Sequence, residues 1–185
     1  EGRAKGVITH KGDSIESQWV GLTVGVTPNI DFLKNSDLEL GRGVKVNSYL
    51  ETNLPNIYAI GDCAEQMEPV SGRRSIEAVW YTGRMMGETL AQTVVGKKTK
   101  YAPGHWFNSA KFFDIEYQTY GLVNFSIPGG KSIYWEHKDG KHSIRIVFRE
   151  EGVIGFNLMG IRFRHEVCQK WIEQKRPIEY VLENL

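Results

Sequence analysis

The sequence predicts an α+β protein built from two successive parts. Up to about Lys100, short apolar runs typical of buried strands alternate with glycine turns and lead into one strong helical pattern, as in an α/β layer. After that point a stretch dense in aromatic residues precedes three runs with period-two alternation. These runs indicate an antiparallel sheet with a helix on one face. We place the boundary near Lys100 to Pro103.

The first part contains several strand-like segments. The most informative is the apolar run 56–60, which predicts a buried strand that Gly61 and Asp62 end. The other patterns, in chain order, are two short strands joined at a glycine turn (5–17), a buried strand that Pro28 follows (18–26), a short helix or irregular turn (30–40) and an exposed strand (43–52).

The longest helical pattern runs from Ser75 to about Val95. Ser75 has the residue type of an N-cap, and Gly96 followed by lysines is typical of a helix end. The apolar positions that recur at helical spacing are Ile76, Val79, Trp80, Met86, Leu90 and Val94.

The second part predicts a meander of three strands, within 131–138, 142–150 and 153–158, separated by short polar turns. A helix follows and stops at Pro177, and 178–185 predicts a final short helix. A helix from His165 to Lys175 is too short to cover the apolar face of the sheet. The residues that period-two spacing places on its faces are Ile133, Trp135, Ile144, Ile146 and Phe148.

Composition and charge exclude several classes of protein. The 23 Lys and Arg residues balance 22 Asp and Glu residues, so we expect no nucleic-acid partner and no attraction to an acidic membrane surface. No apolar run approaches the roughly 18 residues of a membrane helix. Two distant cysteines, Cys63 and Cys168, favour a reducing, cytoplasmic location. The five histidines lack zinc-ligand spacing, so we expect no metal, and His137 and His142 are expected to be ordinary residues beside a hairpin turn.

Asp62 is the candidate binding residue that the pattern itself singles out. An acid just beyond the carboxyl end of a strand lies where open α/β sheets bind ligands, and a carboxylate accepts hydrogen bonds from hydroxyls. Gly61 allows a ligand or a backbone to approach closely. The residues alone leave two interpretations open: Asp62 binds a polyhydroxyl ligand, or it caps the turn.

A family resemblance favours the first interpretation. Residues 52–65, TNLPNIYAIGDCAE, resemble the second FAD-binding signature of the pyridine nucleotide–disulfide oxidoreductase superfamily, whose members carry two dinucleotide-binding domains. Upstream, residues 21–33 resemble the G-x-x-P-N segment of the same family. The second part is similar to the terminal domain of the branch that holds NADH oxidases, rubredoxin and ferredoxin reductases and the flavin part of nitrite reductases.

The resemblance implies three domains: residues 1–18 as the last hairpin of the NAD(P)H-binding domain, 19–100 as the C-terminal part of the FAD-binding domain (α/β), and 101–185 as an antiparallel sheet plus helix that forms a possible dimerisation domain. The G-x-G-x-x-G loops and the redox cysteine pair of the family do not occur in this sequence. We therefore expect a C-terminal fragment of a longer enzyme, which is inactive and binds no FAD by itself.

The resemblance also implies site residues. Gly61 and Asp62 match the residues that hold the ribitol of FAD, and Thr52 matches a structural hydroxyl before the strand. The residues expected where a helix N-terminus faces the flavin ring are Ser75, Ile76 and Glu77, with Trp80 and Tyr81 nearby. Trp80 either touches the flavin or belongs to the core. Catalytic residues are unknown, because no general acid or base is visible, and Cys63 is not expected to react.

The function that this resemblance implies is that of an FAD-dependent NAD(P)H oxidoreductase. Hydride passes from NAD(P)H to FAD and on to an acceptor that the sequence does not identify. The expected partners are the upstream part of the same chain and a second copy in a homodimer. The alternative is a non-catalytic dimerisation or protein-interaction module that uses the aromatic stretch 101–120. A G-x-G-x-x-G upstream in the gene is required by the first function only.

Overall fold

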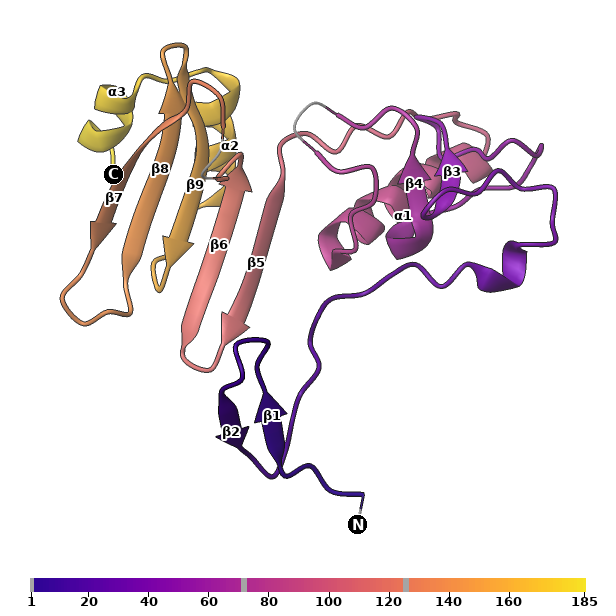
Figure 1. Ribbon diagram of the computed structural model, residues 1–185. Coiled ribbons are helices and arrows are strands. Elements are labelled where there is room, and N and C mark those ends of the chain that lie inside the picture. Colours follow the sequence, from indigo (N-terminus) through magenta and orange to yellow (C-terminus); the bar gives the residue numbers. More distant parts are fainter. Residues whose placement is uncertain (1, 71–72, 125–126) are drawn as a thin grey trace.

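The computed structural model describes residues 2–70, 73–124 and 127–185. Figure 1 shows an N-terminal hairpin, a central lobe that contains helix α1, and a C-terminal sheet with two helices. Within the described residues the strands form two two-stranded sheets and one five-stranded sheet. The fold class is α+β, as predicted. No helix in these ranges is long and apolar enough to cross a membrane.

The N-terminal hairpin consists of β1 (Gly6–Ile8) and β2 (Ser14–Glu16), which pair antiparallel. The turn between them contains Gly12 at φ 89°, a left-handed conformation that glycine adopts without strain. The Thr9 hydroxyl donates a hydrogen bond to Asp13 Oδ2 at 3.2 Å across this turn. The two predicted strands and their glycine turn are therefore confirmed.

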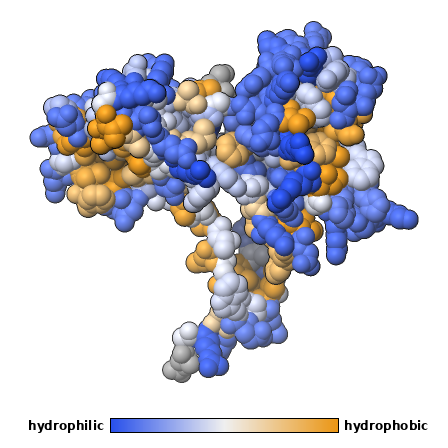
Figure 2. Space-filling view, turned by 180° about the vertical axis from the view of Figure 1, so that it is seen from behind, coloured by the Kyte–Doolittle hydropathy of each residue, from blue (hydrophilic) through white to orange (hydrophobic). Residues whose placement is uncertain are grey.

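The apolar segment 18–26, predicted as a buried strand, is not one. It has no strand assignment, and the side chains of Trp19 and Val24 are 81% and 95% exposed. A strand needs a neighbouring strand to pair with, and no described segment pairs with this one. Figure 2 shows hydrophobic atoms open to solvent on the narrow stalk that carries the hairpin. The apolar pattern is real, but the residues that the structure describes leave most of it exposed.

The central lobe contains short elements and one long helix. Its first elements are η1 (Asp31–Leu33), β3 (Val44–Val46), η2 (Gly61–Cys63) and β4 (Ala64–Gln66). Strands β3 and β4 pair in parallel, with Val44 opposite Ala64 and Val46 opposite Gln66. The segment 43–52 was predicted as an exposed strand. Only three of its residues form a strand, and Val44 and Val46 are buried because they face the core of the lobe.

The predicted buried strand 56–60 is also corrected. Tyr58 makes a single isolated bridge with Glu51, and Ile57 and Ile60 are exposed. The segment is extended but lacks a continuous partner strand. Gly61 and Asp62 consequently belong to the 3-10 turn η2, which leads into β4, rather than to the end of a formed strand.

Helix α1 (Trp80–Val94) begins five residues later than predicted. Ser75 is not its N-cap, because the Ser75 carbonyl accepts a hydrogen bond from the Gln66 amide at 2.8 Å and keeps this segment beside β4. The helix ends before Gly96, at φ 94°, as expected. It closes the core of the lobe, whose buried members are Val46, Leu50, Ala64, Met86 and Tyr101.

The C-terminal sheet is antiparallel, with strand order β5-β6-β9-β8-β7 (Figure 1). Its strands are β5 (Phe107–Phe112), β6 (Ile115–Gly121), β7 (Lys131–Glu136), β8 (Ser143–Arg149) and β9 (Gly152–Met159). The predicted meander is confirmed as β7-β8-β9. The aromatic stretch forms the β5–β6 hairpin, which joins the sheet through β9.

Two helices cover one face of this sheet: α2 (His165–Glu173) and α3 (Ile178–Glu183), with Pro177 as the N-cap residue of α3. Cys168 of α2 and Val181 of α3 lie in one buried cluster with Ile146 of β8. Ile133 and Trp135 lie opposite Ile146 and Ile144 and therefore share this face. Strand β7, the edge strand beside β8, is nevertheless exposed throughout.

Candidate functional site

The turn η2 brings Gly61 and Asp62 against helix α1. Gly61 has φ 75°, which favours glycine, and a Cβ at this position would meet no atom within 4 Å, so the turn is open to solvent on that side. On its other side the Gly61 amide lies 3.3 Å from Met86 Sδ. A Cβ on Gly83 would lie 3.6 Å from Gly61 Cα, so a small residue in the helix allows this close approach.

Asp62 is exposed, and its carboxylate makes no hydrogen bond or ion pair with any residue that the structure describes. The turn therefore does not use the Asp62 side chain as a cap. Of the two interpretations that the sequence left open, the turn cap has no contact to support it. A carboxylate beside an open glycine retains all of its acceptor capacity for hydroxyl donors.

Thr52 fixes the turn that precedes this segment. Its hydroxyl donates to the Ile57 carbonyl at 2.9 Å and accepts from the Leu54 amide at 3.2 Å. The Thr52 amide donates to the same Ile57 carbonyl at 3.0 Å. These bonds lie within the turn, as the structural role predicted for Thr52 requires.

Glu77 belongs to a buried ion pair. The Arg73 and Glu77 side chains are only 7% and 8% exposed and make two hydrogen bonds, one of them from Arg73 Nε to Glu77 Oε1 at 2.8 Å. Thr82 donates to the same carboxylate at 3.3 Å. This carboxylate is already used, so Glu77 can offer a ligand its backbone but hardly its side chain.

Arg73 also ties the central lobe to the segment that leads into the C-terminal sheet. Its guanidinium donates to the Gly104 carbonyl at 3.2 Å and lies 5.5 Å from the centre of the Trp106 ring. Burial raises the pKa of the nearby Tyr101 to about 12; the positive charge of Arg73 lowers this pKa slightly, and the negative charge of Glu77 raises it. Tyr101 is therefore neutral at physiological pH.

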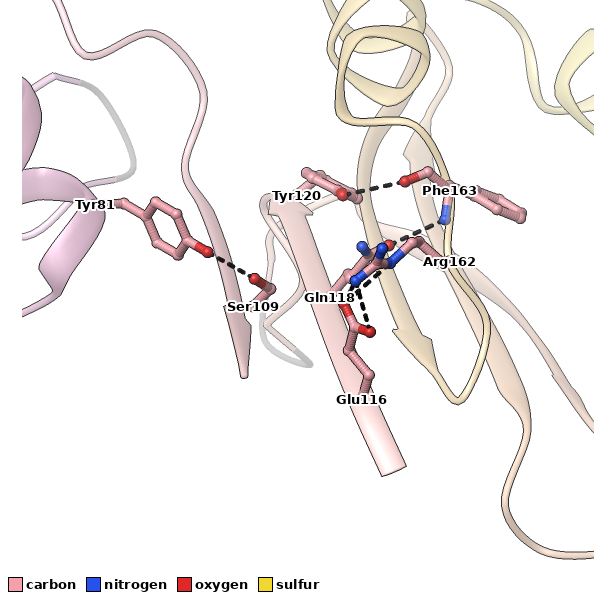
Figure 3. A network of polar contacts seen from close by, with 7 residues as sticks. All are labelled: Tyr81, Ser109, Glu116, Gln118, Tyr120, Arg162 and Phe163. Atoms are coloured by element: carbon pink, nitrogen blue, oxygen red, sulfur yellow. Dashed lines mark hydrogen bonds and ion pairs between the residues drawn. The ribbon is translucent and has the colours of Figure 1, made fainter. Parts of the chain in front are cut away.

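A second tie joins helix α1 to strand β5. The Tyr81 hydroxyl lies 2.9 Å from the hydroxyl of Ser109 (Figure 3), and the Tyr81 ring packs 4.9 Å from the centre of the Phe107 ring. Further along the sheet in the same view, Arg162 pairs with Glu116, and Gln118 accepts from the Phe163 amide at 3.0 Å. These contacts hold the loop before α2 on β6.

A cleft of about 460 Å³ lies between the central lobe and the C-terminal sheet. Its lining from the central lobe is Arg73, Arg74, Glu77, Ala78 and Val79, together with Gly25 and Val26, and its lining from the sheet side is Trp106 and residues 121–124. The cleft therefore lies beside the N-terminus of α1, where the first amides of the helix have no carbonyl partner in a preceding turn.

The structure brings together only some of the predicted site residues. Gly61 and Asp62 meet α1 at Gly83, and Glu77 lines the cleft at the start of the helix. Ser75 lies beside β4, where its carbonyl is bonded. Trp80 is 67% exposed, which excludes the predicted core alternative, and its ring lies 5.7 Å from the Arg84 guanidinium.

Sequence reasoning missed three features of this region. The glycine at position 83 is one; its signal is the small-residue spacing Gly83-x-x-x-Gly87 on a helix face. The others are the Arg73–Glu77 pair, whose i,i+4 spacing was visible although no helix forms there, and Trp106.

The cysteines differ in accessibility. Cys168 is buried, and burial raises the pKa of its thiol to about 12, so it stays a protonated thiol. Cys63 is half-buried, and its Sγ lies 3.6 Å from the Ile60 carbonyl oxygen. Both thiols are free.

Several known proteins have sequences similar to this chain. A rubredoxin-NAD(+) reductase of Acinetobacter baylyi is 43% identical over 164 residues, and residues 1–87 match the family described as pyridine nucleotide-disulphide oxidoreductase. The chain is thus similar to this family of proteins. An NADH oxidase of Methanocaldococcus jannaschii is 28% identical over 174 residues, which include 80% of the chain. The family resemblance predicted from residues 52–65 is thus confirmed.

The similarity covers most of the chain but only part of each relative. The alignment with the rubredoxin-NAD(+) reductase includes 86% of the chain and 38% of that protein. The alignment with the NADH oxidase includes 36% of that protein. The fold matches the solved covalent putidaredoxin reductase–putidaredoxin complex with a TM-score of 0.77 at 17% identity, over 96% of the chain and 42% of that structure. This likeness confirms the predicted fold, while the division into domains at residues 18 and 100 stays a prediction.

Proposed function

We propose that this chain is the C-terminal part of an FAD-dependent NAD(P)H oxidoreductase. The observation that carries the proposal is the open Gly61 turn beside the Asp62 carboxylate, which contacts none of the described residues, in a chain whose residues 1–87 match the pyridine nucleotide-disulphide oxidoreductase family. When bound, FAD supplies the hydride and electron chemistry, and the protein supplies placement and electrostatics.

The residues present fit a flavin. The Asp62 carboxylate accepts hydrogen bonds from the ribitol hydroxyls, and Gly61 leaves room for the chain of the cofactor, because no atom lies within 4 Å of its Cβ position. The cleft beside Glu77 to Val79 is bounded by the start of α1. Helix amides at that end stabilise negative charge on a bound ring system.

The structure changes which residues we assign to the flavin ring. Because α1 starts at Trp80 and not at Ser75, the positive end of the helix lies five residues further along the chain than predicted. We propose that the backbone at Glu77, Ala78 and Val79 faces the ring, that the exposed Trp80 lies beside it, and that Ser75 and Ile76 support the loop. The glycine loops for both dinucleotides would come from residues upstream of this chain.

We also propose a cytoplasmic homodimer that passes electrons to a carrier protein. The free thiols of Cys63 and Cys168 agree with a reducing compartment. The exposed strand β7, with Ile133 and Trp135 on the face that α2 covers elsewhere, offers an apolar edge for a second copy. The non-catalytic module is not favoured, because the related proteins are named as reductases and oxidases.

The test uses the full-length protein and the variant Asp62→Ala. A hydrogen bond to a charged group contributes about 1.5–3 kcal/mol, so we expect roughly a ten- to hundred-fold loss of FAD affinity in a titration of the apoprotein. Asp62→Asn keeps the shape and one acceptor oxygen and should lose less. Asp114→Ala, at an exposed turn position, is the matched control and should bind FAD like the wild type. Unchanged affinity in Asp62→Ala would remove the central observation of the proposal.

A further inference from the structure

The turn between β7 and β8 holds two histidines in a fixed relation. The His137 amide donates to the His142 carbonyl at 2.8 Å, and the Gly140 amide donates to the His137 carbonyl at 3.0 Å. Gly140 has φ 68°, which allows the chain to reverse. Because these backbone bonds close the turn, the two imidazole rings are placed near each other, with their centres 6.0 Å apart.

Asp139 lies between these histidines. Its Oδ1 accepts a hydrogen bond from the Lys141 amide at 2.8 Å, which fixes the carboxylate. Its Oδ2 lies 3.0 Å from His137 Nδ1 and 2.7 Å from His142 Nδ1. The Lys141 amide, with contributions from both histidines, holds the pKa of the Asp139 carboxyl well below its usual range, so it is ionised.

The three side chains can also be reached from solvent. They are 46%, 35% and 43% exposed for His137, Asp139 and His142, and their ligand atoms all lie within 4.8 Å of one another. Among the residues that the structure describes, this is the one group of three or more such side chains close enough to share an ion.

We propose that this turn binds a divalent first-row transition metal ion, with Zn²⁺ as its representative, through His137, Asp139 and His142. Zn²⁺ takes tetrahedral nitrogen and oxygen ligands at about 2.1 Å, which lie about 3.4 Å apart. The two Nδ1–Oδ2 separations of 3.0 and 2.7 Å need to open only slightly, by side-chain rotation. Water completes the coordination, and the ion takes the place of the proton between Asp139 Oδ2 and His142 Nδ1.

The ligand set also predicts selectivity. Two of the three protein ligands are imidazole nitrogens, which suit Zn²⁺, Ni²⁺ and Cu²⁺, whereas Mg²⁺ and Ca²⁺ prefer oxygen ligands. Cu²⁺ should bind most tightly by the general order of stability. The exposed Lys138 and Lys141 lie in the same turn and repel a cation, while Glu136 adds a nearby negative charge, so moderate affinity is expected.

Metal binding would stabilise the exposed β7–β8 hairpin at the edge of the sheet. The ligands come from both ends and the middle of one turn, so an ion that binds only the folded turn stabilises the β7–β8 hairpin by linkage. The Trp135 ring, centred 6.0 Å from that of His137, lies close enough to report the event.

The experiment titrates Zn²⁺ into the tag-free full chain by calorimetry and follows Co²⁺ by its visible absorption. We expect one ion per chain, a higher Tm with Zn²⁺, and no response to Mg²⁺. Affinity should fall by about ten-fold or more in Asp139→Asn, which keeps an acceptor for the Lys141 amide, and in His142→Asn. His10→Asn changes an exposed histidine in the other hairpin and should bind Zn²⁺ like the wild type.

Two results would overturn the proposal: no Zn²⁺ binding by the wild type, or binding that Asp139→Asn and His142→Asn leave unchanged. The second would assign the ion to other groups and the contacts of Asp139 to shared protons only. If either variant fails to fold, the imidazole resonances of the wild type decide. Zn²⁺ should shift the signals of His137 and His142 and leave those of the other histidines in place; the opposite pattern refutes the site.

Discussion

Removing the Glu77 carboxylate should destabilise the protein far more than removing a similar carboxylate from the surface. The Arg73 and Glu77 side chains are 7% and 8% exposed, so Glu77→Ala leaves a charged guanidinium buried without its partner. Breaking a buried pair in this way typically costs about 3–5 kcal/mol. Arg73 keeps the Gly104 carbonyl and the face of Trp106, so we expect the lower end, about 3 kcal/mol.

The chain provides a matched control in Arg84 and Glu88. They have the same i,i+4 spacing, but both are more than 60% exposed, so Glu88→Ala should cost only about 0.5 kcal/mol. Urea unfolding monitored by circular dichroism gives both values, and equal m-values would show that the folded and unfolded states remain comparable. Replacing both members, as Arg73→Met with Glu77→Leu, should recover part of the loss. If Glu77→Ala costs no more than Glu88→Ala, the pair is not structural, and the Glu77 side chain is free to serve a ligand.

Three further predictions concern the chain by itself. Purified with added FAD and then desalted, it should not retain the cofactor, because no G-x-G-x-x-G loop is present to bind the diphosphate; a stoichiometric yellow complex would contradict this. Phe112→Ala with Phe113→Ala should leave the chain folded and more soluble, because these side chains are 63% and 98% exposed. Loss of the folded circular-dichroism signal would instead assign both side chains to a core. Sedimentation of the wild type and of the double variant should show whether the chain self-associates through these side chains. A thiol reagent at neutral pH should label Cys63 and spare Cys168, whose burial raises its thiol pKa to about 12, and rapid labelling of both would mean that α2 opens readily.

The C-terminal sheet could be predicted from the sequence because its pairing is mostly local. Strands β7, β8 and β9 follow one another, and each pairs with the next across a short turn, so the period-two pattern and the turn residues carry the information needed. The helix before Pro177 was equally readable, although α2 already ends at Glu173 and Pro177 is the N-cap residue of α3.

The central lobe was less predictable because distant contacts override local patterns. The pattern at 18–26 predicts a strand, but a strand forms only beside a partner, and Trp19 and Val24 remain exposed. Ser75 has the residue type of an N-cap, but its bond to the Gln66 amide keeps it outside the helix. Neither the missing partner strand of 18–26 nor the bond of Ser75 can be inferred from residue type and short-range spacing.

The candidate site was predictable in part. The Gly61-Asp62 pair followed from its motif, whereas the proposed ligand group at the β7–β8 turn does not contain a histidine pair at familiar zinc spacing. The i, i+2, i+5 pattern of His137, Asp139 and His142 brings its ligand atoms together only when a hairpin turn reverses the chain.

The central lobe and the C-terminal sheet are held together by two separate contacts, which limit how far the two parts can move relative to each other. The Arg73 guanidinium donates to the Gly104 carbonyl and lies near the Trp106 ring, and the Tyr81 hydroxyl lies within hydrogen-bond distance of the Ser109 hydroxyl. A single attachment would act as a pivot, but two attachments resist both rotation and separation. Arg73 and Trp106 themselves line the cleft, so we expect the spacing between its walls at Glu77 and Leu122 to change little when a ligand binds. A ligand that binds in a preformed cleft therefore loses little binding free energy to rearrangement of the protein.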